Sequence, residues 1–278
     1  MTAKVLPLYP KAGSLRPLQG LYLEHRLHEV GSAQSPLVYG SFVSSLDGRI
    51  ALMEPGGLHV LEGLTSPSDF RLLQELHAQA DCLITNAGYL RALARGELGN
   101  MLQVSAPDLL EWRRQNRLAP QPAIVVASSS LDFPMHPSIQ EHRQPLYIAT
   151  GRQADFTRVQ TLRERGLQVI FAGEGAMVEG AALVNALSAL GYKCAYLLAG
   201  PKILETMLRE RQLSRLYLTI RHRLLGGNAF HTLIHGQPLG ASGVLALRTL
   251  YYDVAENDGV GQWFAQLDCV GITVTPAA

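Results

Sequence analysis

Short apolar strands and amphipathic helices alternate along most of the chain, and this alternation limits the possible folds more than any other feature of the sequence. The first predicted strand spans 37–43, and the helix after it spans 67–80, with Phe70, Leu73 and Leu76 on one face. Further strands are predicted at 81–85, 123–127, 146–149, 168–171, 195–198 and 215–220, and further helices at 107–116, 156–165, 178–190 and 202–211. Such alternation predicts an α/β fold with a mostly parallel sheet and helices on both faces.

Both ends of the chain depart from this alternation. Two β-rich segments, 244–254 and 263–274, have no helix between them, which predicts an antiparallel edge to the sheet. Residues 1–35 show no sustained periodicity because proline and glycine interrupt them, although a short helix fits 21–30. We therefore predict an N-terminal extension over 1–35 and a single domain over 36–278, since no repeat or flexible linker divides the rest of the chain.

Composition argues against several classes of function. The 278 residues carry a formal net charge of +1, which provides no basic surface for nucleic acid or an anionic membrane. No apolar run approaches the ~18 residues of a membrane span, and the N-terminus lacks the apolar region of a secretory signal. Cys82, Cys194 and Cys269 are odd in number and far apart, so neither a disulfide framework nor a thiolate metal site is indicated. We expect a cytoplasmic protein that binds neither nucleic acid nor membrane.

Four predicted strands end in small, hydroxyl-bearing or glycine residues. These ends are Asp47-Gly48 after the first strand, Asn86–Gly88 after the second, Ser128–Ser130 after the third and Ala199–Pro201 after a later one. Each alone is compatible with an ordinary turn, and Asp-Gly is a strong turn sequence. In an open α/β sheet, however, ligands bind beyond the carboxyl ends of the strands, and a Gly-Pro helix start leaves backbone N–H groups for a phosphate. The coincidence of four such ends favours a ligand site.

Two further patterns suggest chemistry but match their motifs poorly. Gly173, Gly175 and Gly180 lie between a strand and a helix, as in a dinucleotide-binding turn, yet the spacing is G-x-G-x-x-x-x-G and the acid expected about 20 residues on is absent. His231 and His235 are four residues apart, but the glutamate of a zinc-peptidase helix is missing and the stretch is rich in glycine. We predict no metal site.

Five stretches of the sequence carry a resemblance to a known family. They read S-S-L-D-G-R-I-A, A-D-C-L-I-T-N-A-G, A-I-V-V-A-S-S-S, L-L-A-G-P-K-I-L and L-Y-L-T-I-R-H-R-L-L-G-G. From Pro36 to the C-terminus the chain resembles the reductase domain of the riboflavin-biosynthesis deaminase–reductase family, which has a dihydrofolate-reductase-like fold. The resemblance implies an NADPH-dependent reductase, usually a homodimer. In the family's best-known case the substrate is a phosphorylated ribosylaminopyrimidine, 5-amino-6-(5-phosphoribosylamino)uracil.

The sequence departs from the family pattern mostly on the substrate side. Leu198-Ala199-Gly200 stands where the family usually has Glu-Gly-Gly, Tyr89 replaces a threonine, and the Asp-Pro segment that commonly follows is absent. Leu76-His77-Ala78 replaces Leu-Arg-Ala, and no proline precedes Leu-Leu-Gly-Gly. The sequence has no His-x-Glu motif paired with Pro-Cys-x-x-Cys, so nothing in it resembles the family's zinc deaminase domain. The resemblance therefore leaves the substrate open.

The resemblance implies roles for particular residues. The pyrophosphate of NADPH is expected at Thr85, Asn86, Ala87, Gly88, Ala199, Gly200 and Pro201, and the adenosine at Ser128, Ser129 and Ser130. Arg152, after the next strand, is expected to pair with the 2′-phosphate. Asp47 and Arg49 are expected beside the nicotinamide as the catalytic pair, with Asp47 on a ring or ribose hydroxyl and Arg49 on an anionic group of the substrate. Ser45 and Ser66 are expected to contact the substrate, although Ser66 also suits a helix N-cap.

Two other functions are compatible with the sequence. The altered Leu198-Ala199 and the missing Asp-Pro segment also suit a nucleotide-binding protein without catalytic activity. A dihydrofolate- or pterin-type reductase is a further alternative, but Asp69 and Glu75, the only acids of the first long helix, are not at convincing pterin-binding positions. The predicted homodimer is supported by a segment that is apolar on both faces, through Leu245, Leu247, Leu250, Tyr251 and Tyr252.

Overall fold

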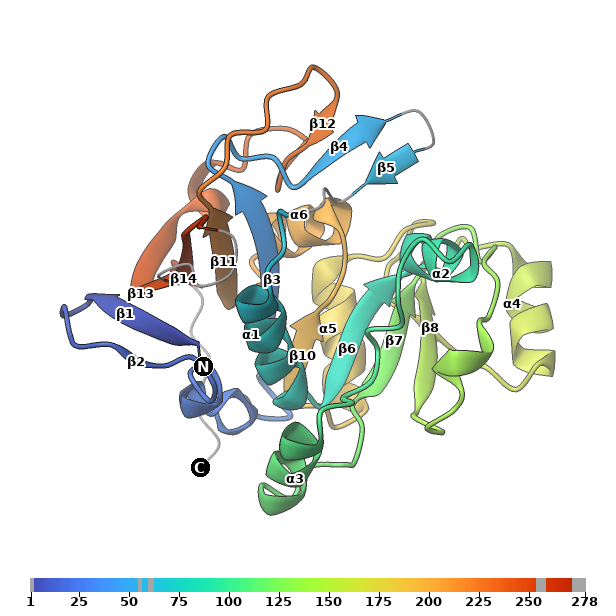
Figure 1. Cartoon of the computed structure of the whole chain (residues 1–278). Coiled ribbons are helices and arrows are strands. Elements are labelled where there is room, and N and C mark those ends of the chain that lie inside the picture. The colour runs from blue at the N-terminus through green and yellow to red at the C-terminus, as the bar shows by residue number, and fades with distance from the viewer. Residues whose placement is uncertain (1–2, 55–56, 60–62, 254–258, 272–278) are drawn as a thin grey trace.

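A twisted mixed sheet forms the centre of the computed structural model, which describes residues 3–54, 57–59, 63–253 and 259–271 (Figure 1). Its strands are β1 (Lys4–Tyr9), β2 (Arg16–Pro17), β3 (Leu37–Ser45), β6 (Cys82–Asn86), β7 (Ala123–Ala127), β8 (Leu146–Thr150), β9 (Gln168–Phe171), β10 (Cys194–Leu197), β11 (Arg215–Arg221), β13 (Leu245–Asp253) and β14 (Gln262–Cys269). Their order across the sheet is β2-β1-β13-β14-β11-β3-β10-β6-β7-β8-β9.

The sheet divides into a parallel part and an antiparallel part. Neighbouring strands from β11 to β9 run parallel, whereas β14, β13, β1 and β2 are joined to one another and to β11 in antiparallel register. The parallel strand β7 is buried along its whole length, which explains its unbroken apolar sequence. The predicted fold class, a mostly parallel sheet with an antiparallel edge, is confirmed.

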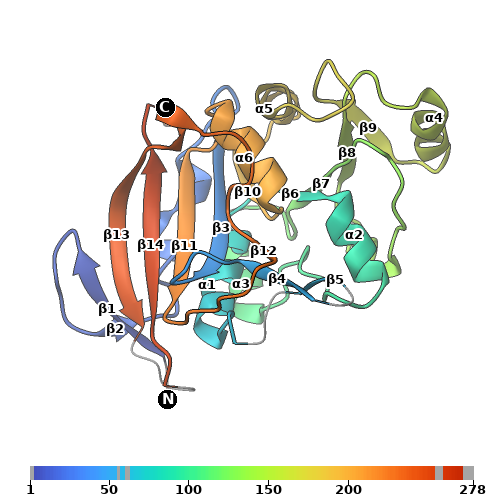
Figure 2. The ribbon, with the colours of Figure 1, turned by 90° about the horizontal axis from the view of Figure 1, so that it is seen from above.

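Helices cover both faces of the sheet, as predicted. Figures 1 and 2 show α1 (Pro67–Ala78) and α3 (Pro107–Gln115) on one face and α5 (Gly180–Ala189) and α6 (Pro201–Arg209) on the other. The predicted apolar face of α1 is confirmed only in part, because Leu76 is buried but Phe70 is exposed and Leu72 is buried in its place. The buried face also includes Glu75, which is fully buried and accepts the backbone N–H groups of Gly20 at 2.6 Å and Tyr22 at 2.9 Å. A charged residue on the buried face is invisible to an apolar periodicity.

Several elements were not predicted. Residues 1–35 do not form the expected helix over 21–30, which is two 3₁₀ turns (Leu23–His25 and Leu27–Glu29), and β1 joins the main sheet beside β13. A further short helix, α2 (Ala87–Ala94), follows β6 where no helix was predicted. The predicted helix at 156–165 is α4 (Phe156–Glu164). A small second sheet contains β4 (Ala51–Glu54), β5 (Gly57–His59) and β12 (Phe230–His231) and lies beyond the end of β3 (Figure 1). The predicted strand ends at 254 and 272–274 fall outside the described residues.

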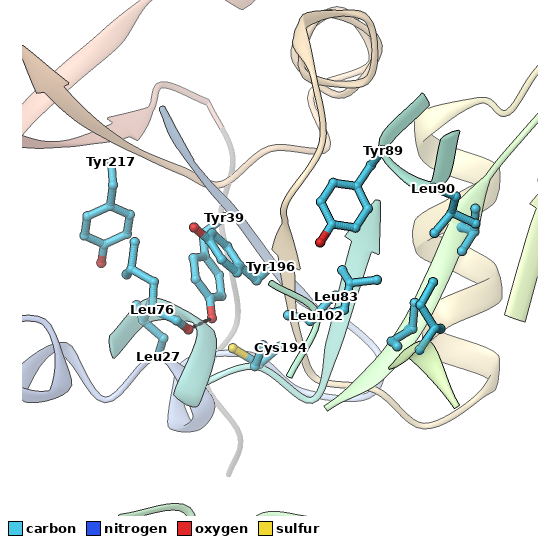
Figure 3. Close-up of a cluster of buried hydrophobic side chains, with 14 of the residues drawn as sticks. Leu27, Tyr39, Leu76, Leu83, Tyr89, Leu90, Leu102, Cys194, Tyr196 and Tyr217 are labelled. Carbon is cyan, nitrogen blue, oxygen red and sulfur yellow. Dashed lines mark hydrogen bonds between the residues drawn. The ribbon is translucent and has the colours of Figure 1, made fainter. Parts of the chain in front are cut away.

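A buried aromatic cluster connects α1 to the parallel strands (Figure 3). The ring of Tyr39 stacks on that of Tyr196 with centroids 5.1 Å apart, and its hydroxyl donates to the carbonyl of Leu76 at 2.7 Å. These contacts pack the start of β3 and the end of β10 against α1. All three cysteines are free and buried, and burial raises the pKa of the Cys82 and Cys194 thiols, which makes both poor nucleophiles.

Candidate functional site

A cavity of about 610 Å³ opens at the carboxyl ends of β10, β6 and β7. These strands are adjacent, and β3 lies beside β10, so the cavity lies along an edge of four strands that spans roughly 14 Å at about 4.8 Å per strand. Its wall is formed by Ile50, Asn86, Ala87, Gly88, Arg91, Ala127, Ser128, Ser129, Ser130, Met177, Val178, Gly200, Pro201, Lys202, Ile203, Glu205, Thr206, His231 and His235. An elongated ligand fits such a groove better than a compact one.

Two helices begin at this cavity. Helix α2 is capped by Asn86, whose Oδ1 accepts the backbone N–H of Tyr89 at 3.0 Å. Gly88 permits this cap, because a Cβ there would lie 2.7 Å from the same oxygen. Helix α6 begins at Gly200 without any side-chain cap, and a Cβ on Gly200 would meet nothing closer than the Asn86 amide nitrogen at 4.0 Å. The start of α6 therefore faces open space with uncapped N–H groups, the arrangement that binds anions.

The charges around the cavity favour an anion. The cationic side chains of Arg91 and Lys202 line it together with the positive ends of α2 and α6. The one acid among the lining residues, Glu205, is neutralised by Arg209 at 2.7 Å and accepts the backbone N–H of Gly236 at 3.1 Å. Hydrogen bonds from Arg209 lower the pKa of Glu205, so this carboxyl stays ionised but paired.

The three serines after β7 form the far wall of the cavity. Ser128 is buried and its hydroxyl accepts the N–H of Leu131 at 2.9 Å, whereas Ser129 and Ser130 are exposed. Arg158 of α4 donates to the carbonyl of Ser130 at 2.7 Å. Arg152 does not line the cavity and pairs with Glu174 at 3.0 Å on the surface. Arg158 therefore borders the serine end of the groove, whereas Arg152 does not.

The Ser-Ser-Leu-Asp-Gly-Arg turn lies next to the cavity and is held by the protein itself. The Asp47 carboxylate accepts the backbone N–H groups of Leu225 at 3.1 Å and Gly226 at 2.9 Å and is also bonded to the Ser45 hydroxyl and the Arg49 guanidinium. Burial alone would raise the pKa of Asp47, but these hydrogen bonds and the Arg49 charge lower it to about 2. This contact explains why the Asp-Gly-Arg and Leu-Leu-Gly-Gly stretches occur in one sequence.

Arg49 is also committed to local contacts. Its guanidinium lies 4.2 Å from the centroid of the Phe230 ring and 3.3 Å from the carbonyl of Gly227. Its Nε atom is buried without a hydrogen-bond partner. The next residue, Ile50, lines the cavity, so the turn borders the groove through its neighbour rather than through its charges.

A second polar cluster lies between α1 and the antiparallel strands, and Ser66 is its one member that the sequence analysis assigned to the substrate. The Ser66 hydroxyl caps α1 by accepting the N–H of Asp69 at 3.0 Å and also accepts the side-chain amide of Gln262 at 2.7 Å. Burial raises the pKa of Asp69 to about 6, opposed by its hydrogen bond with the Thr219 hydroxyl and by the Arg221 charge. The partners of Asp69 lie far along the chain, which is why its position on the helix did not reveal this environment.

The structure thus brings some, but not all, of the predicted site residues together in the cavity. The predicted residues that line the cavity are Asn86, Ala87, Gly88, Ser128, Ser129, Ser130, Gly200 and Pro201. Those that do not are Ser45, Asp47, Arg49, Ser66, Thr85, Arg152 and Ala199, and Thr85 is fully buried with no hydrogen-bond partner for its hydroxyl. The other lining residues were not predicted, and they include Met177 and Val178, from the glycine-rich loop after β9, and the histidines His231 and His235.

Sequence comparison agrees with this architecture. Residues 36–257 match the model of the RibD C-terminal domain. The chain belongs to this family. The resemblance noted from the motifs is confirmed, and RibD-type reductases are oxidoreductases of riboflavin biosynthesis. No curated protein matches the sequence. Within the described residues, no helix is long and apolar enough to cross a bilayer, and no three His, Cys, Asp or Glu side chains gather as they would around a metal ion.

Solved structures share the RibD C-terminal fold at low sequence identity. A pyrimidine reductase-like protein from Corynebacterium diphtheriae has a TM-score of 0.63 at 20% identity, over 85% of this chain and 93% of that one. RibD from Acinetobacter baumannii gives 0.61 at 18% identity, over 85% of this chain but only 58% of its own length. The riboflavin biosynthesis reductase Rib7 from Saccharomyces cerevisiae gives 0.55 at 13% identity, over 89% and 98% of the two chains. These likenesses support the fold.

Proposed function

We propose that the protein is an NADPH-dependent reductase that transfers a hydride to a pyrimidine-ribosylamine-like or related small anionic substrate. The observation that carries the proposal is the meeting of two helix N-termini, α2 and α6, in one cavity at the ends of adjacent parallel strands. A pyrophosphate requires several N–H donors and a positive field without a competing free acid, and this cavity provides both. Family membership supplies the class of chemistry.

The residues present suit a dinucleotide lying along the groove. Asn86–Gly88 and Gly200–Lys202 would hold the pyrophosphate, and Ser128–Ser130 the adenosine. Arg152 would exchange its surface partner Glu174 for the 2′-phosphate, a small loss because exposed ion pairs contribute about 0–1 kcal/mol. Thr85 and Ala199 do not line the cavity and would contribute to cofactor binding only through the backbone of the turns that contain them. When bound, NADPH supplies the hydride, and the protein contributes binding, orientation and exclusion of water.

The substrate would enter beside the Asp47 turn. Arg49 would bind its anionic group and Asp47 a ring or ribose hydroxyl. Ser45 lies beside Asp47, and Ser66 is bonded to Gln262, which lies two strands away from Ser45. Reduction of a C=N or C=O bond also consumes a proton. Asp69 of α1 does not line the cavity, but it is the candidate donor on the substrate side because its pKa of about 6 keeps part of the carboxyl protonated near neutral pH.

Fluorescence titration with NADPH and NADH tests the cofactor assignment. We expect tighter binding of NADPH, because serine and arginine side chains surround the end of the groove where the 2′-phosphate would lie. Equal affinities for the two cofactors, or no binding of either, would contradict the assignment.

A nucleotide-binding protein without catalysis is the second candidate, since Leu198 stands where the family usually has an acid. A panel of phosphorylated ribosylamines, pterins and small carbonyl compounds separates the two possibilities. Steady oxidation of NADPH with any of them supports the reductase. Tight NADPH binding with no turnover across the panel supports the non-catalytic protein.

We also propose that the protein is a cytoplasmic homodimer joined through its antiparallel edge. Val244 and Val270 lie side by side there, joined by a backbone hydrogen bond of 3.1 Å, and are 51% and 50% exposed. Leu247 on β13 is also exposed, whereas Tyr251 is buried in the core. Sedimentation at micromolar concentration should show a dimer, and a species with only the 30.3 kDa monomer mass would refute it.

A further inference from the structure

Two histidines form the wall of the cavity nearest the Asp47 turn. His231 lies on β12 and His235 four residues later, and both line the cavity together with Ile50. The Nδ1 atom of His231 is 3.0 Å from the Nε2 atom of His235, and the ring centroids are 4.7 Å apart in a T-shaped arrangement. We call His231 and His235 the histidine pair.

Hydrogen bonding determines where the protons of the pair lie. The backbone N–H of Thr232 also points at Nε2 of His235, at 3.2 Å, and a backbone N–H can only donate. The Nε2 atom of His235 is therefore an unprotonated acceptor, and Nδ1 of His231 carries the shared proton. The Nε2 atom of His231 is left with a free lone pair. It can accept one further proton without breaking the bond between the rings.

The pair is fixed relative to the start of α6. The carbonyl of His231 accepts the N–H of Ile50 at 2.9 Å, which ties β12 to β4. On the other side, Glu205 accepts the N–H of Gly236, and Arg209 donates to the carbonyls of the following two residues. Because both ends of the segment are anchored, the rings keep their place beside the cavity when its occupant changes.

The surroundings of the pair disfavour an added proton while no anion is present. Lys202 lines the same cavity from α6, where Glu205 is paired with Arg209, and Arg49 lies over the ring of Phe230, the residue before His231. Burial, followed by the neighbouring His235, lowers the pKa of His231. A multiply charged phosphate in the cavity would reverse the sign of the local field.

We propose that the histidine pair belongs to the cofactor site and takes up one proton, on Nε2 of His231, when the phosphates of a dinucleotide bind. This inference rests on the proposed function, because the anion is the cofactor. The proton then forms a charge-assisted hydrogen bond to the ligand and makes the binding of cofactor stronger as the pH falls. Helices α2 and α6 would supply the part of the affinity that does not depend on pH.

Isothermal titration calorimetry of the whole protein with NADP⁺ tests the inference without any turnover. Titrations at pH 7.5 in two buffers of different ionisation enthalpy give the number of protons taken up. We expect net uptake, and an affinity that rises by up to about tenfold per pH unit from pH 8.5 to pH 6.5.

The matched variant is the double substitution His231→Asn and His235→Gln. Asparagine keeps a donor near the Nδ1 position and glutamine keeps an acceptor near the Nε2 position, so the link between the two side chains can survive, but neither amide titrates. This variant should lack the proton uptake at pH 7.5 and the rise in NADP⁺ affinity between pH 8.5 and pH 6.5. His142→Asn, at an exposed histidine outside the cavity, should leave the uptake unchanged.

Each outcome decides the inference. Binding of NADP⁺ with no proton uptake, or uptake that persists in the double variant, overturns the role of the histidine pair and leaves the proposed cofactor site intact. Absence of NADP⁺ binding in the unmodified protein overturns both. If the double variant unfolds, the single variant His231→Asn, which removes the group that takes up the proton, provides the decision, and uptake that persists in it overturns the inference.

Discussion

Two strand ends at the same edge of the sheet use their polar groups in opposite ways. After β3, the Asp47 carboxylate is bonded to two backbone N–H groups, a hydroxyl and a guanidinium, all within the protein. After β10, Gly200 begins α6 with no side-chain cap and open space around its Cα. The first turn satisfies its own hydrogen bonds, whereas the second leaves donors for a ligand.

This difference shows that the more conspicuous motif need not be the one that binds. Asp-Gly-Arg contains two charges, but they are directed at each other and at the loop Leu225–Gly227. Ala-Gly-Pro contains no charge, and its lack of side-chain atoms creates room at a helix start. A ligand site is marked by unused hydrogen-bonding groups, which a list of polar residues does not reveal.

The largest effect, on cofactor binding, is expected from Gly200→Val in the turn that begins α6. Gly200 has φ of −74°, which any residue can adopt, and a Cβ there would meet no atom within 4 Å except the Asn86 amide. The fold should therefore survive, while the valine side chain projects into the cavity and blocks the pyrophosphate. We expect NADPH affinity to fall by more than about a hundredfold, or roughly 3 kcal/mol, in a fluorescence titration.

Gly99→Val is the matched control, because Gly99 is exposed, also has open space around its Cα, and lies outside the cavity. It should bind NADPH normally. Normal binding by Gly200→Val would place the pyrophosphate elsewhere, and the loop with Gly173 and Gly175 that contributes Met177 to the cavity wall would be the next candidate.

Local sequence signals predicted the parts of the molecule that depend on local physics. The strand 123–127 has its predicted bounds because an unbroken apolar run between turn residues marks a buried parallel strand. The strand 168–171 also has its predicted bounds, although it lies at the edge of the sheet and its end residues are exposed. The four strand ends were found because small residues and glycines are visible in the sequence. Three of them, Asn86–Gly88, Ser128–Ser130 and Gly200-Pro201, line one cavity.

Features created by contacts between distant segments could not be predicted. Helix α2 forms because Asn86 caps it and Leu90 and Leu93 are buried, but eight residues with a glycine near the start show little periodicity. The burial of Asp69 beside Thr219 depends on strand β11, and the histidine pair reaches the cavity because β12 pairs with β4. None of these partners is near its counterpart in the sequence.

The surroundings of Asp47 and Asp69 shift the pKa values of these two carboxyl groups in opposite directions. Asp47 is surrounded by donors and has a pKa of about 2, whereas burial raises that of Asp69 to about 6. The folded protein therefore keeps a proton on Asp69 that the unfolded chain releases near pH 4, so the stability contribution falls as the pH rises from about 4 to about 6. Asp69→Asn removes this loss.

The measurement is urea unfolding of the original protein and of Asp69→Asn across that range. Relative to the original protein, the variant should gain up to about 3 kcal/mol between pH 4 and pH 7, at about 1.4 kcal/mol per pKa unit. If Asp69 is also the proton donor, NADPH oxidation should fall while NADPH affinity stays the same. A difference between the two proteins that does not change with pH would show that Asp69 is ionised in the fold.

A smaller loss of stability is expected at the Ser-Ser-Leu-Asp-Gly-Arg turn, where Asp47 is held by hydrogen bonds within the protein. Asp47→Asn keeps an acceptor for Leu225 and Gly226 but removes the charge, so the free energy of unfolding should fall by about 1 to 1.5 kcal/mol at pH 7, the difference between charged and neutral hydrogen bonds. The contribution of Asp47 is complete above pH 4 and is lost as the pH falls through about 2, opposite in sign to that of Asp69. Unfolding curves of both proteins at pH 7 and pH 2.5 should converge at the lower pH.

The smallest effect on stability is expected from substitutions of Arg49, which also test whether the Asp47 turn binds the substrate. Arg49→Lys keeps the charge but loses the stacking on Phe230, which is worth about 0.5 to 1 kcal/mol, and Arg49→Gln loses both. If the turn is only structural, the two variants should differ slightly in stability and retain full activity and NADPH affinity. If Arg49 also binds an anionic group of the substrate, Arg49→Gln should raise KM about ten- to a hundredfold for a phosphorylated substrate and hardly at all for an uncharged one. Arg49→Lys should recover most of that loss, because a lysine still presents a cation. Full activity of Arg49→Gln on a phosphorylated substrate would show that the Asp47 turn has only a structural role, and the turn at Gly200 would then be the part of this edge that binds the ligand.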